Sequence, residues 1–212
     1  MMKTISNITA YLAHPILWPG YMILFMKFFN PYAFHAVDKK MLLSFLANTM
    51  YYPIICLLLM RAIGLISDFK MQTQKERIIP FIAIMIFYIW SYKVIKDYQL
   101  VNPEGSFPMI LSIFMLGTLI SVFLAFFINN FYKLSLHMVG MGGMLLTIIF
   151  QSIYAPTNLN YILLFFVILT GFVATTRLYL NAHTFMQVYT GFLIGVIGQI
   201  TGIFFFLQTA LK

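Results

Sequence analysis

Charged residues are scarce in this chain of 212 residues, and acidic residues are the scarcest. Only 8% of the residues are charged, with 13 Lys and Arg against 5 Asp and Glu, whereas 62% are hydrophobic. A water-soluble protein of this length needs a far more polar surface. Together with a mean hydropathy of +0.92, the composition excludes a soluble globular protein and predicts a polytopic membrane protein.

Other features that the sequence lacks narrow the range of possible partners and cofactors further. Cys56 is the single cysteine and lies in an apolar run, so it can close no internal disulfide. The cations are scattered among apolar segments and form no solvent-facing stripe, so we expect no nucleic-acid partner. The opening MMKTISNITAYLAH lacks a cleavable signal pattern. Because the sequence has no spaced cluster of His, Cys and carboxylate residues, we expect neither a metal nor another cofactor.

Apolar runs set the expected architecture, since a membrane span needs about 20 residues. The run over 14–36 contains Pro15, Pro19 and Pro31, so it could be a kinked span or a re-entrant element. Six further runs resemble ordinary spans. We therefore predict an all-α polytopic transmembrane helix bundle with six core helices plus one extra N-terminal span or re-entrant segment, forming a single domain over 1–212. The six runs cover 41–66, 78–95, 107–130, 138–154, 159–175 and 188–210.

Alternate connectors between these runs must emerge on the same face of the membrane, because two spans separate each connector from the next. Ionisable residues at the edge of a membrane are costly to place, so a group of them on one face indicates a functional site. Parity gathers Lys70, Lys75, Arg77, Lys133, His137, Arg177 and His183 on one face.

Spacing within the first two of these connectors predicts how the side chains point. Lys70 and Arg77 are seven residues apart, which is two turns of a helix, so we expect them on one helix face. His137 begins an apolar run and is expected near a helix N-terminus, where free N–H groups favour an anion. Ser135 would add a hydroxyl donor there.

The third connector, in TTRLYLNAHTFMQ, carries another cation and another imidazole. His183 and Gln187 are four residues apart and can meet on one helix face. Arg177 and His183 would point about 240° apart on a continuous helix, so a turn is needed to aim both at one point. Arginines donate paired hydrogen bonds to phosphoryl oxygens, and histidine serves as nucleophile or proton donor. The combination predicts a site for a phosphate ester.

In type, order and spacing these residues resemble the type 2 phosphatidic acid phosphatase superfamily of integral-membrane lipid phosphatases. The motifs of that family read K-x6-R-P, P-S-G-H and S-R-x5-H-x3-D. The resemblance covers about residues 60–200 and is nearest to a bacterial branch with KERIIP and RLYLNAHT segments. The matching segments here are Lys70 to Arg77, LSLH from Leu134 to His137, and TRLYLNAHTFMQ from Thr176 to Gln187.

The resemblance implies a mechanism without a metal or cofactor. His183 would attack phosphorus to form a phosphohistidine, His137 would protonate the leaving oxygen, and water would hydrolyse the intermediate. The implied substrate is an anionic phospholipid or polyprenyl phosphate, such as undecaprenyl pyrophosphate, a lipid A phosphate, phosphatidic acid or phosphatidylglycerol phosphate. The implied phosphoryl ligands are Lys70, Arg77, Ser135 and Arg177.

Four departures from the family pattern bear on activity. The proline after Arg77 is delayed to Pro80, and Leu134 and Leu136 replace a proline and a glycine. Gln187 stands where the family has an aspartate that orients the nucleophile; in the serine protease triad, an amide at the analogous position lowers turnover about ten thousandfold. The chain could thus be a slow enzyme, an enzyme with another orienting group, or a catalytically silent lipid-phosphate binding or scaffold protein.

Residues outside the motifs receive simpler interpretations. His14 and His35 lack partners at a recognisable spacing, so we interpret them as interfacial residues. GFLIG, from Gly191 to Gly195, has the spacing of small residues that allows close helix approach, and favours packing within the bundle over dimerisation. The sequence leaves the oligomeric state open.

Lysine positions predict the orientation of the protein. Fewer lysines other than the implied phosphate ligands lie on the site face, which has Lys3, Lys75 and Lys133. The positive-inside rule then places the site on the extracytoplasmic face, and the resemblance to a bacterial branch implies a bacterial inner membrane. The opposite face carries Lys39, Lys40, Lys93, Lys96 and Lys212.

Overall fold

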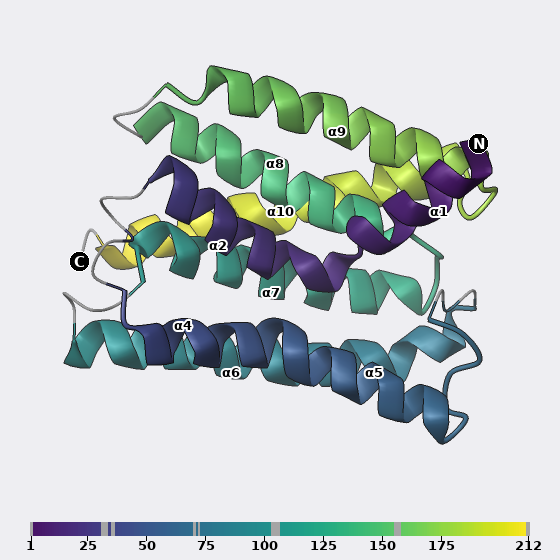
Figure 1. Ribbon diagram of the computed structural model, residues 1–212, viewed down its shortest axis with the longest axis horizontal. Coiled ribbons are helices and arrows are strands. Elements are labelled where there is room, and N and C mark those ends of the chain that lie inside the picture. The colour runs from purple at the N-terminus through teal and green to yellow at the C-terminus, as the bar shows by residue number, and fades with distance from the viewer. Residues whose placement is uncertain are drawn as a thin grey trace.

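The computed structural model describes residues 2–30, 34, 37–69, 71, 73–102, 107–154 and 158–210. All regular elements among these residues are helices, and six helical segments are long and apolar enough to cross a membrane. The helices lie side by side as an elongated bundle (Figure 1). The predicted all-α polytopic bundle is therefore confirmed. The six segments are Lys39–Ala62, Lys75–Val101, Met109–Asn129 (α7), Leu136–Tyr154 (α8), Asn160–Tyr179 (α9) and Phe185–Gln208, which lies within α10 (Phe185–Ala210).

The N-terminal run is a bent helix pair that begins earlier than the sequence predicted. Helix α1 (Met2–Leu12) is followed by a 3-10 turn, η1 (Pro15–Leu17), and by α2 (Trp18–Phe29), with a bend of 46° between the two halves. Proline has no N–H and clashes with the preceding turn, so Pro15 ends the first half. The pair runs from the end of the bundle where the N-terminus lies to the other end (Figure 1), which agrees with a kinked span.

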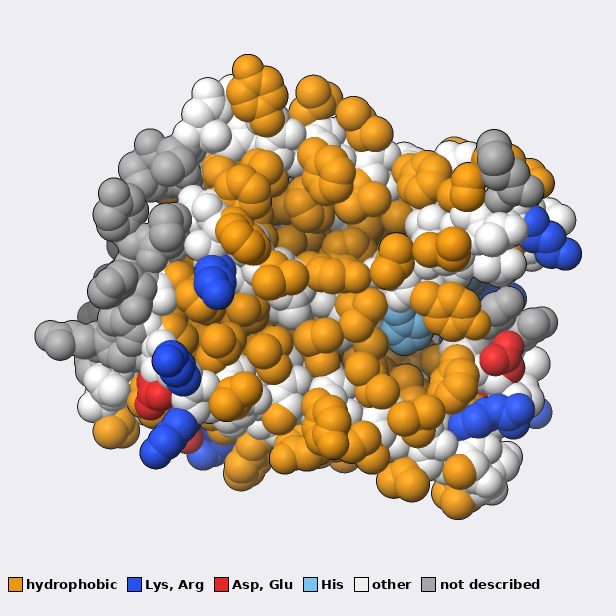
Figure 2. Space-filling model, viewed as in Figure 1, with side chains coloured by type: hydrophobic (Ala, Val, Ile, Leu, Met, Phe, Trp, Pro, Cys, Tyr) orange, Lys and Arg blue, Asp and Glu red, His pale blue; other side chains and the backbone are white. Residues whose placement is uncertain are grey.

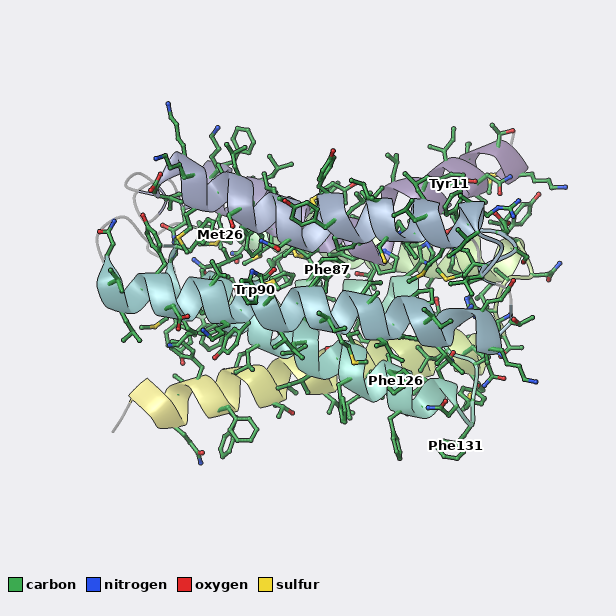
Figure 3. All side chains as sticks on the ribbon, turned by 90° about the horizontal axis from the view of Figure 1, so that it is seen from below. Tyr11, Met26, Phe87, Trp90, Phe126 and Phe131 are labelled. Atoms are coloured by element: carbon green, nitrogen blue, oxygen red, sulfur yellow. The ribbon has the colours of Figure 1, made fainter. Side chains whose placement is uncertain are left out.

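A second bend occurs in the next span, which consists of α4 (Lys39–Leu46), a π-helical turn η2 (Ala47–Tyr51) and α5 (Tyr52–Ala62). Pro53 interrupts the hydrogen-bond ladder here, and the widened turn accommodates it. This span lies along α6 (Ile78–Val101) (Figure 3). The rings of Tyr52 and Phe87 stack between them with centroids 6.2 Å apart.

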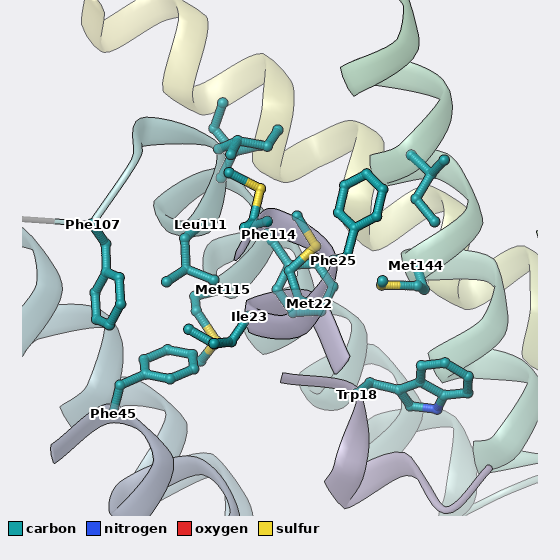
Figure 4. Packing of buried hydrophobic residues seen from close by; sticks show 14 of the residues in the cluster. Trp18, Met22, Ile23, Phe25, Phe45, Phe107, Leu111, Phe114, Met115 and Met144 are labelled. Carbon is teal, nitrogen blue, oxygen red and sulfur yellow. The ribbon is translucent and has the colours of Figure 1, made fainter. Parts of the chain in front are cut away.

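Helix α2 buries one face against the bundle, whereas Leu24 and Phe28 on its other side are exposed. Met22 and Phe25 are buried and pack among α7 and α8, where they meet Leu111, Phe114 and Met144 (Figure 4). In hydrocarbon this packing stabilises the bundle through van der Waals contact, since lipid tails are as apolar as the side chains. Hydrophobic side chains also cover the middle of the outer surface, with Lys and Arg nearer the two ends (Figure 2).

Glycines let α10 approach its neighbours at backbone distance. A Cβ on Gly191 would collide with the carbonyl of Ser135, and one on Gly195 with the carbonyl of Val139 and, at 2.8 Å, the amide nitrogen of Gly143. The GFLIG segment thus packs within the bundle, as its spacing predicts. This contact also fixes the start of α8 against α10, where several of the predicted site residues lie.

We predict that Gly195→Ala destabilises the protein whereas Gly171→Ala does not. Gly171 lies in α9, and a Cβ added there would meet nothing within 4 Å, so alanine should stabilise the helix by about 0.5–1 kcal/mol. At Gly195 the added methyl should cost about 1–3 kcal/mol through overpacking. Thermal unfolding in detergent micelles measures both, and equal midpoints for the two variants would contradict the proposed close contact.

Candidate functional site

The three connectors that precede α6, α8 and α10 meet at the end of the bundle where the N-terminus lies (Figure 1). They surround a cavity of about 580 Å³. Four of the predicted site residues line it, while Ser135 and Gln187 are not among its lining residues. Lys70 lies outside the described residues. The four are Arg77, His137, Arg177 and His183, and Lys133 joins them.

The connector before α6 differs from the sequence prediction. The described residues 71, 73 and 74 are not helical: Met71 has a φ of 40°, and helical structure begins with the 3-10 turn η3 (Lys75–Arg77). Thr73 and Glu76 explain where it begins. The Glu76 carboxylate accepts from the Thr73 N–H at 3.4 Å, and the Thr73 hydroxyl accepts from the Glu76 N–H at 3.4 Å, which is a capping box.

Main-chain carbonyls hold the two arginines in place. Arg77 is 5% exposed and donates from Nε to the Met71 carbonyl at 2.9 Å and from Nη1 to the Leu134 carbonyl at 3.0 Å. Arg177, also 5% exposed, donates from Nη2 to the Ser6 carbonyl at 3.2 Å. Its Nε is buried and has no partner among the described residues. Each guanidinium therefore retains donors that carbonyl groups do not use.

No Asp or Glu lies within salt-bridge distance of either guanidinium in the part of the chain that the structure describes, although the charge of Glu76 acts on Arg77 from further away. The one ion pair in that part, Lys93 with Asp97 at 2.8 Å, is exposed on the surface, and Glu76 bonds Ser67 and Thr73. A buried charge without a counterion is costly, so an anion in the cavity would be strongly favoured. The cationic lining residues are Lys3, Arg77, Lys133 and Arg177, and no Asp or Glu is found among the described lining residues.

The LSLH segment is joined to the elements on both sides by its backbone. The Leu134 carbonyl accepts from Arg77, and the Ser135 N–H donates to the Gln187 carbonyl at 3.1 Å. The Ser135 hydroxyl is fully buried and has no partner among the described residues. Ser135 is not among the residues that line the cavity, whereas Leu136 is.

His137 is the second residue of α8 and is oriented by the end of α1. Its Nε2 lies 2.9 Å from the Ala10 carbonyl. A carbonyl only accepts, so Nε2 carries the hydrogen and Nδ1 is the basic nitrogen of the neutral ring. The carbonyl is free because the His14 N–H, which a continuous helix would direct to Ala10, bonds Tyr11 instead at 3.2 Å. The break at Pro15 thus supplies the acceptor for His137.

A turn between α9 and α10 carries His183 away from Arg177, as the sequence requires. Asn181 adopts a φ of 50°, and the N–H groups of Asn181 and Ala182 donate to the carbonyls of Leu178 at 2.9 Å and Arg177 at 3.2 Å. This pattern is a Schellman motif, in which asparagine tolerates the left-handed conformation. Both Arg177 and His183 consequently line the same cavity.

Gln187 orients His183 through a second capping box. The Thr184 N–H donates to the Gln187 Oε1 at 3.3 Å, while the Gln187 N–H donates to the Thr184 hydroxyl at 3.4 Å. The same Oε1 lies 3.1 Å from the His183 Nδ1. Because an N–H needs an acceptor, the backbone of Thr184 fixes the amide with its oxygen toward the ring. His183 therefore carries its hydrogen on Nδ1, and its Nε2 is the basic nitrogen.

The surroundings of His183 keep the ring neutral at ordinary pH. Burial lowers the pKa of His183 to about 4; the hydrogen bond to Gln187 opposes this shift, and the charges of Arg77, Lys133 and Arg177 add to it. Burial and the nearby Arg77 also lower the pKa of Lys133. A neutral imidazole with an unprotonated Nε2 has the form required of a nucleophile.

Helix α1 contributes residues that the sequence analysis assigned no role. Lys3, Asn7 and Ala10 line the cavity from α1, and His14 follows them at the break. In the sequence His14 has no partner at a recognisable spacing, but in the structure its ring lies edge-on to that of His137 with centroids 5.8 Å apart. Lys3 and Asn7 are four residues apart and fall on one face of α1, and this spacing was the available signal.

Comparisons with known proteins identify no relative. No protein-family model, curated protein or solved structure matches the chain.

We predict that His183 titrates near pH 4 rather than near its ordinary pKa of 6.5. NMR of the protein with [13Cε1]-histidine in micelles measures this, and loss of a signal in His183→Ala assigns it. Gln187→Leu should lower the midpoint further because the hydrogen bond raises the pKa. Gln187→Glu keeps the capping box and should raise it through the added carboxylate. A wild-type midpoint near 6.5 would contradict the buried position of the ring.

Proposed function

We propose that the protein is a membrane lipid phosphatase that hydrolyses a phosphate or pyrophosphate monoester of a lipid. The observation that carries this proposal is the meeting, in one cavity, of two buried arginines without carboxylate partners and an imidazole whose Nε2 is unprotonated. A phosphate ester carries the negative charge that would pair with the arginines, and its phosphorus is an electrophile that the imidazole can attack.

Arg77 and Arg177 would bind the phosphoryl oxygens through the guanidinium donors that remain free. Lys133 lines the same cavity and would add a further positive charge. These groups are held before substrate arrives, so they can stabilise the charge that develops on the phosphoryl oxygens in the transition state without reorganising. The family resemblance adds Lys70 and Ser135 to the proposed ligands.

The proposed reaction has two steps. The His183 Nε2 attacks phosphorus, so an N–P bond forms as the P–O bond to the lipid breaks, and His137 gives its proton to the leaving oxygen. Binding of the anion favours the protonated form of His137 that this step needs. Water then attacks phosphorus and passes a proton to His137, and the N–P bond breaks to release phosphate and restore His183.

Gln187 would serve in place of the family aspartate. Its oxygen, fixed by the Thr184 N–H, accepts the Nδ1–H of His183 throughout the reaction. The Gln187 amide therefore does not donate to the ring, which would favour the other tautomer of His183. A neutral oxygen stabilises the positive charge of the phosphohistidine less than a carboxylate does, so we expect turnover that is slow rather than absent.

The walls of the cavity favour a lipid ester over a soluble one. One side is apolar, and Ile54 and Leu58 of α5 lie on the lipid-facing surface of the bundle as well as on the cavity wall. A narrower apolar cavity of about 80 Å³ shares several of the lining residues and extends toward Phe114 and Tyr88 in the bundle interior. An alkyl chain could enter from the membrane while its phosphate meets Arg77.

The protein is a multi-pass membrane protein by its helices. We further propose the bacterial inner membrane and an extracytoplasmic site. The lysine distribution supports this orientation, because Lys39, Lys40, Lys93 and Lys96 precede or end spans on the side opposite the cavity. The resemblance to a bacterial branch supports the type of membrane.

A second candidate function is a catalytically silent lipid-phosphate binding or scaffold protein. Leu136 favours it, since its side chain occupies a position on the cavity wall where the family has glycine. Such a protein would use the same arginines but would leave phosphorus unattacked.

We predict that purified protein in micelles releases phosphate from at least one lipid of a panel. The panel contains undecaprenyl pyrophosphate, lipid A, phosphatidic acid and phosphatidylglycerol phosphate. His183→Ala should reduce the rate by at least about a thousandfold because the nucleophile is removed. Lys93→Gln, at an exposed position in α6 away from the cavity, should leave the rate unchanged and is the control.

Phosphate release by His183→Ala at the wild-type rate would exclude the phosphohistidine mechanism. Absence of release from every lipid, with phosphate lipids still bound through Arg77 and Arg177, would establish the silent binding protein instead.

A further inference from the structure

A third histidine faces the cavity from the break between α1 and α2. His14 lies in the cavity lining together with His137, and its ring meets that of His137 edge-on with centroids 5.8 Å apart. The family motifs involve no residue from this part of the chain. The position of His14 depends on Pro15, which ends α1 and turns the chain into η1.

The hydrogen bonds of His14 fix which nitrogen is available. The Ile16 N–H donates to the His14 Nδ1 at 3.4 Å, as the side chain caps η1. An acceptor nitrogen carries no hydrogen, so the hydrogen of the neutral ring is on Nε2. Among the described residues nothing accepts a hydrogen bond from Nε2. Since the ring is part of the cavity wall, Nε2 offers the cavity a donor.

The three histidines thus differ in the groups they can offer a ligand. His183 has its basic Nε2 free, His137 has Nε2 bound to the Ala10 carbonyl, and His14 has an Nε2–H without a partner among the described residues. A donor beside His137 suits an oxygen that carries negative charge. The end of α1 also brings Asn7 to the same wall.

We propose that His14 is an additional ligand of the bound phosphate group, donating its Nε2–H to an oxygen on the side of His137. The proposal deepens the proposed function and rests on it for the identity of the anion. Neutral His14 adds a hydrogen bond without adding another buried charge to the four cations of the lining, Lys3, Arg77, Lys133 and Arg177. The N-terminal helix pair is then part of the binding site as well as a span.

Two conservative variants separate this role from a purely structural one. Asparagine places its side-chain oxygen near the position of Nδ1, so His14→Asn should keep the cap on Ile16 but lose the donor toward the cavity. Glutamine places its amide nitrogen near the position of Nε2, so His14→Gln should keep that donor and weaken the cap. If His14 is a ligand, His14→Asn should bind phosphate more weakly than His14→Gln. If His14 is only a cap, His14→Gln should be the more impaired of the two variants.

The experiment measures binding of inorganic phosphate to the full chain in micelles by calorimetry, with thermal unfolding of the same samples. We expect His14→Asn to weaken phosphate binding about tenfold or more, the effect of losing a hydrogen bond to a charged group. Its unfolding midpoint should remain that of the wild type. His14→Gln should bind phosphate within about threefold of the wild type by the same reasoning.

Two other results would contradict the role of His14 as a phosphate ligand. Wild-type binding by His14→Asn, or an equal loss of binding and stability in both variants, would overturn the ligand role and leave His14 as a cap. Phosphate binding does not require turnover. If the expected order appears while no lipid is hydrolysed, the proposed enzymatic function fails and the ligand role of His14 stands.

Discussion

The site depends on one electrostatic constraint, the burial of Arg77 and Arg177 without a carboxylate within salt-bridge distance among the described residues. Carbonyl groups of Met71, Leu134 and Ser6 hold the guanidinium groups but neutralise little of their charge. Such an arrangement is costly in a membrane protein and is sustained only by the packing around it. An anion in the cavity would relieve this cost, which is why we propose that the cavity binds one.

Helix ends supply almost every other part of the site. The break at Pro15 frees the Ala10 carbonyl for His137 and places His14 beside it. Capping boxes start η3 and α10, and the second of these also aims the Gln187 oxygen at His183. A helix terminus has unsatisfied backbone groups that side chains and ligands can use. The bundle thus forms a polar site at one end while its middle stays apolar.

Most of the fold follows from the sequence because membrane spans have a strong and simple signal. The length of a span follows from the thickness of the bilayer. The face on which a connector emerges follows from the number of spans that precede it. The small-residue spacing of GFLIG likewise predicts the close packing of α10, since only glycine at Gly191 and Gly195 fits against a neighbouring backbone. These are local properties of the chain.

The site was less accessible to sequence analysis where it depends on contacts between distant segments. The contacts of Ala10 with His137 and of Ser6 with Arg177 join residues more than a hundred positions apart, and no spacing rule predicts them. The missing helix before Arg77 had a local signal, the Thr73 and Glu76 capping box. The same pattern at Thr184 and Gln187 turns the side-chain oxygen of Gln187 toward His183, which the spacing of the two residues alone does not predict.

The proposed mechanism requires above all that the His183 Nε2 becomes bonded to phosphorus. In a direct measurement, the protein is mixed with an intact lipid phosphate that it hydrolyses. The reaction is stopped in alkali, where phosphohistidine survives, and the phosphoryl group is located by mass spectrometry. We predict a phosphoryl group on the peptide that contains His183 and none on that peptide in His183→Ala. Turnover without a phosphorylated intermediate, or a phosphoryl group on any other residue, would contradict the mechanism.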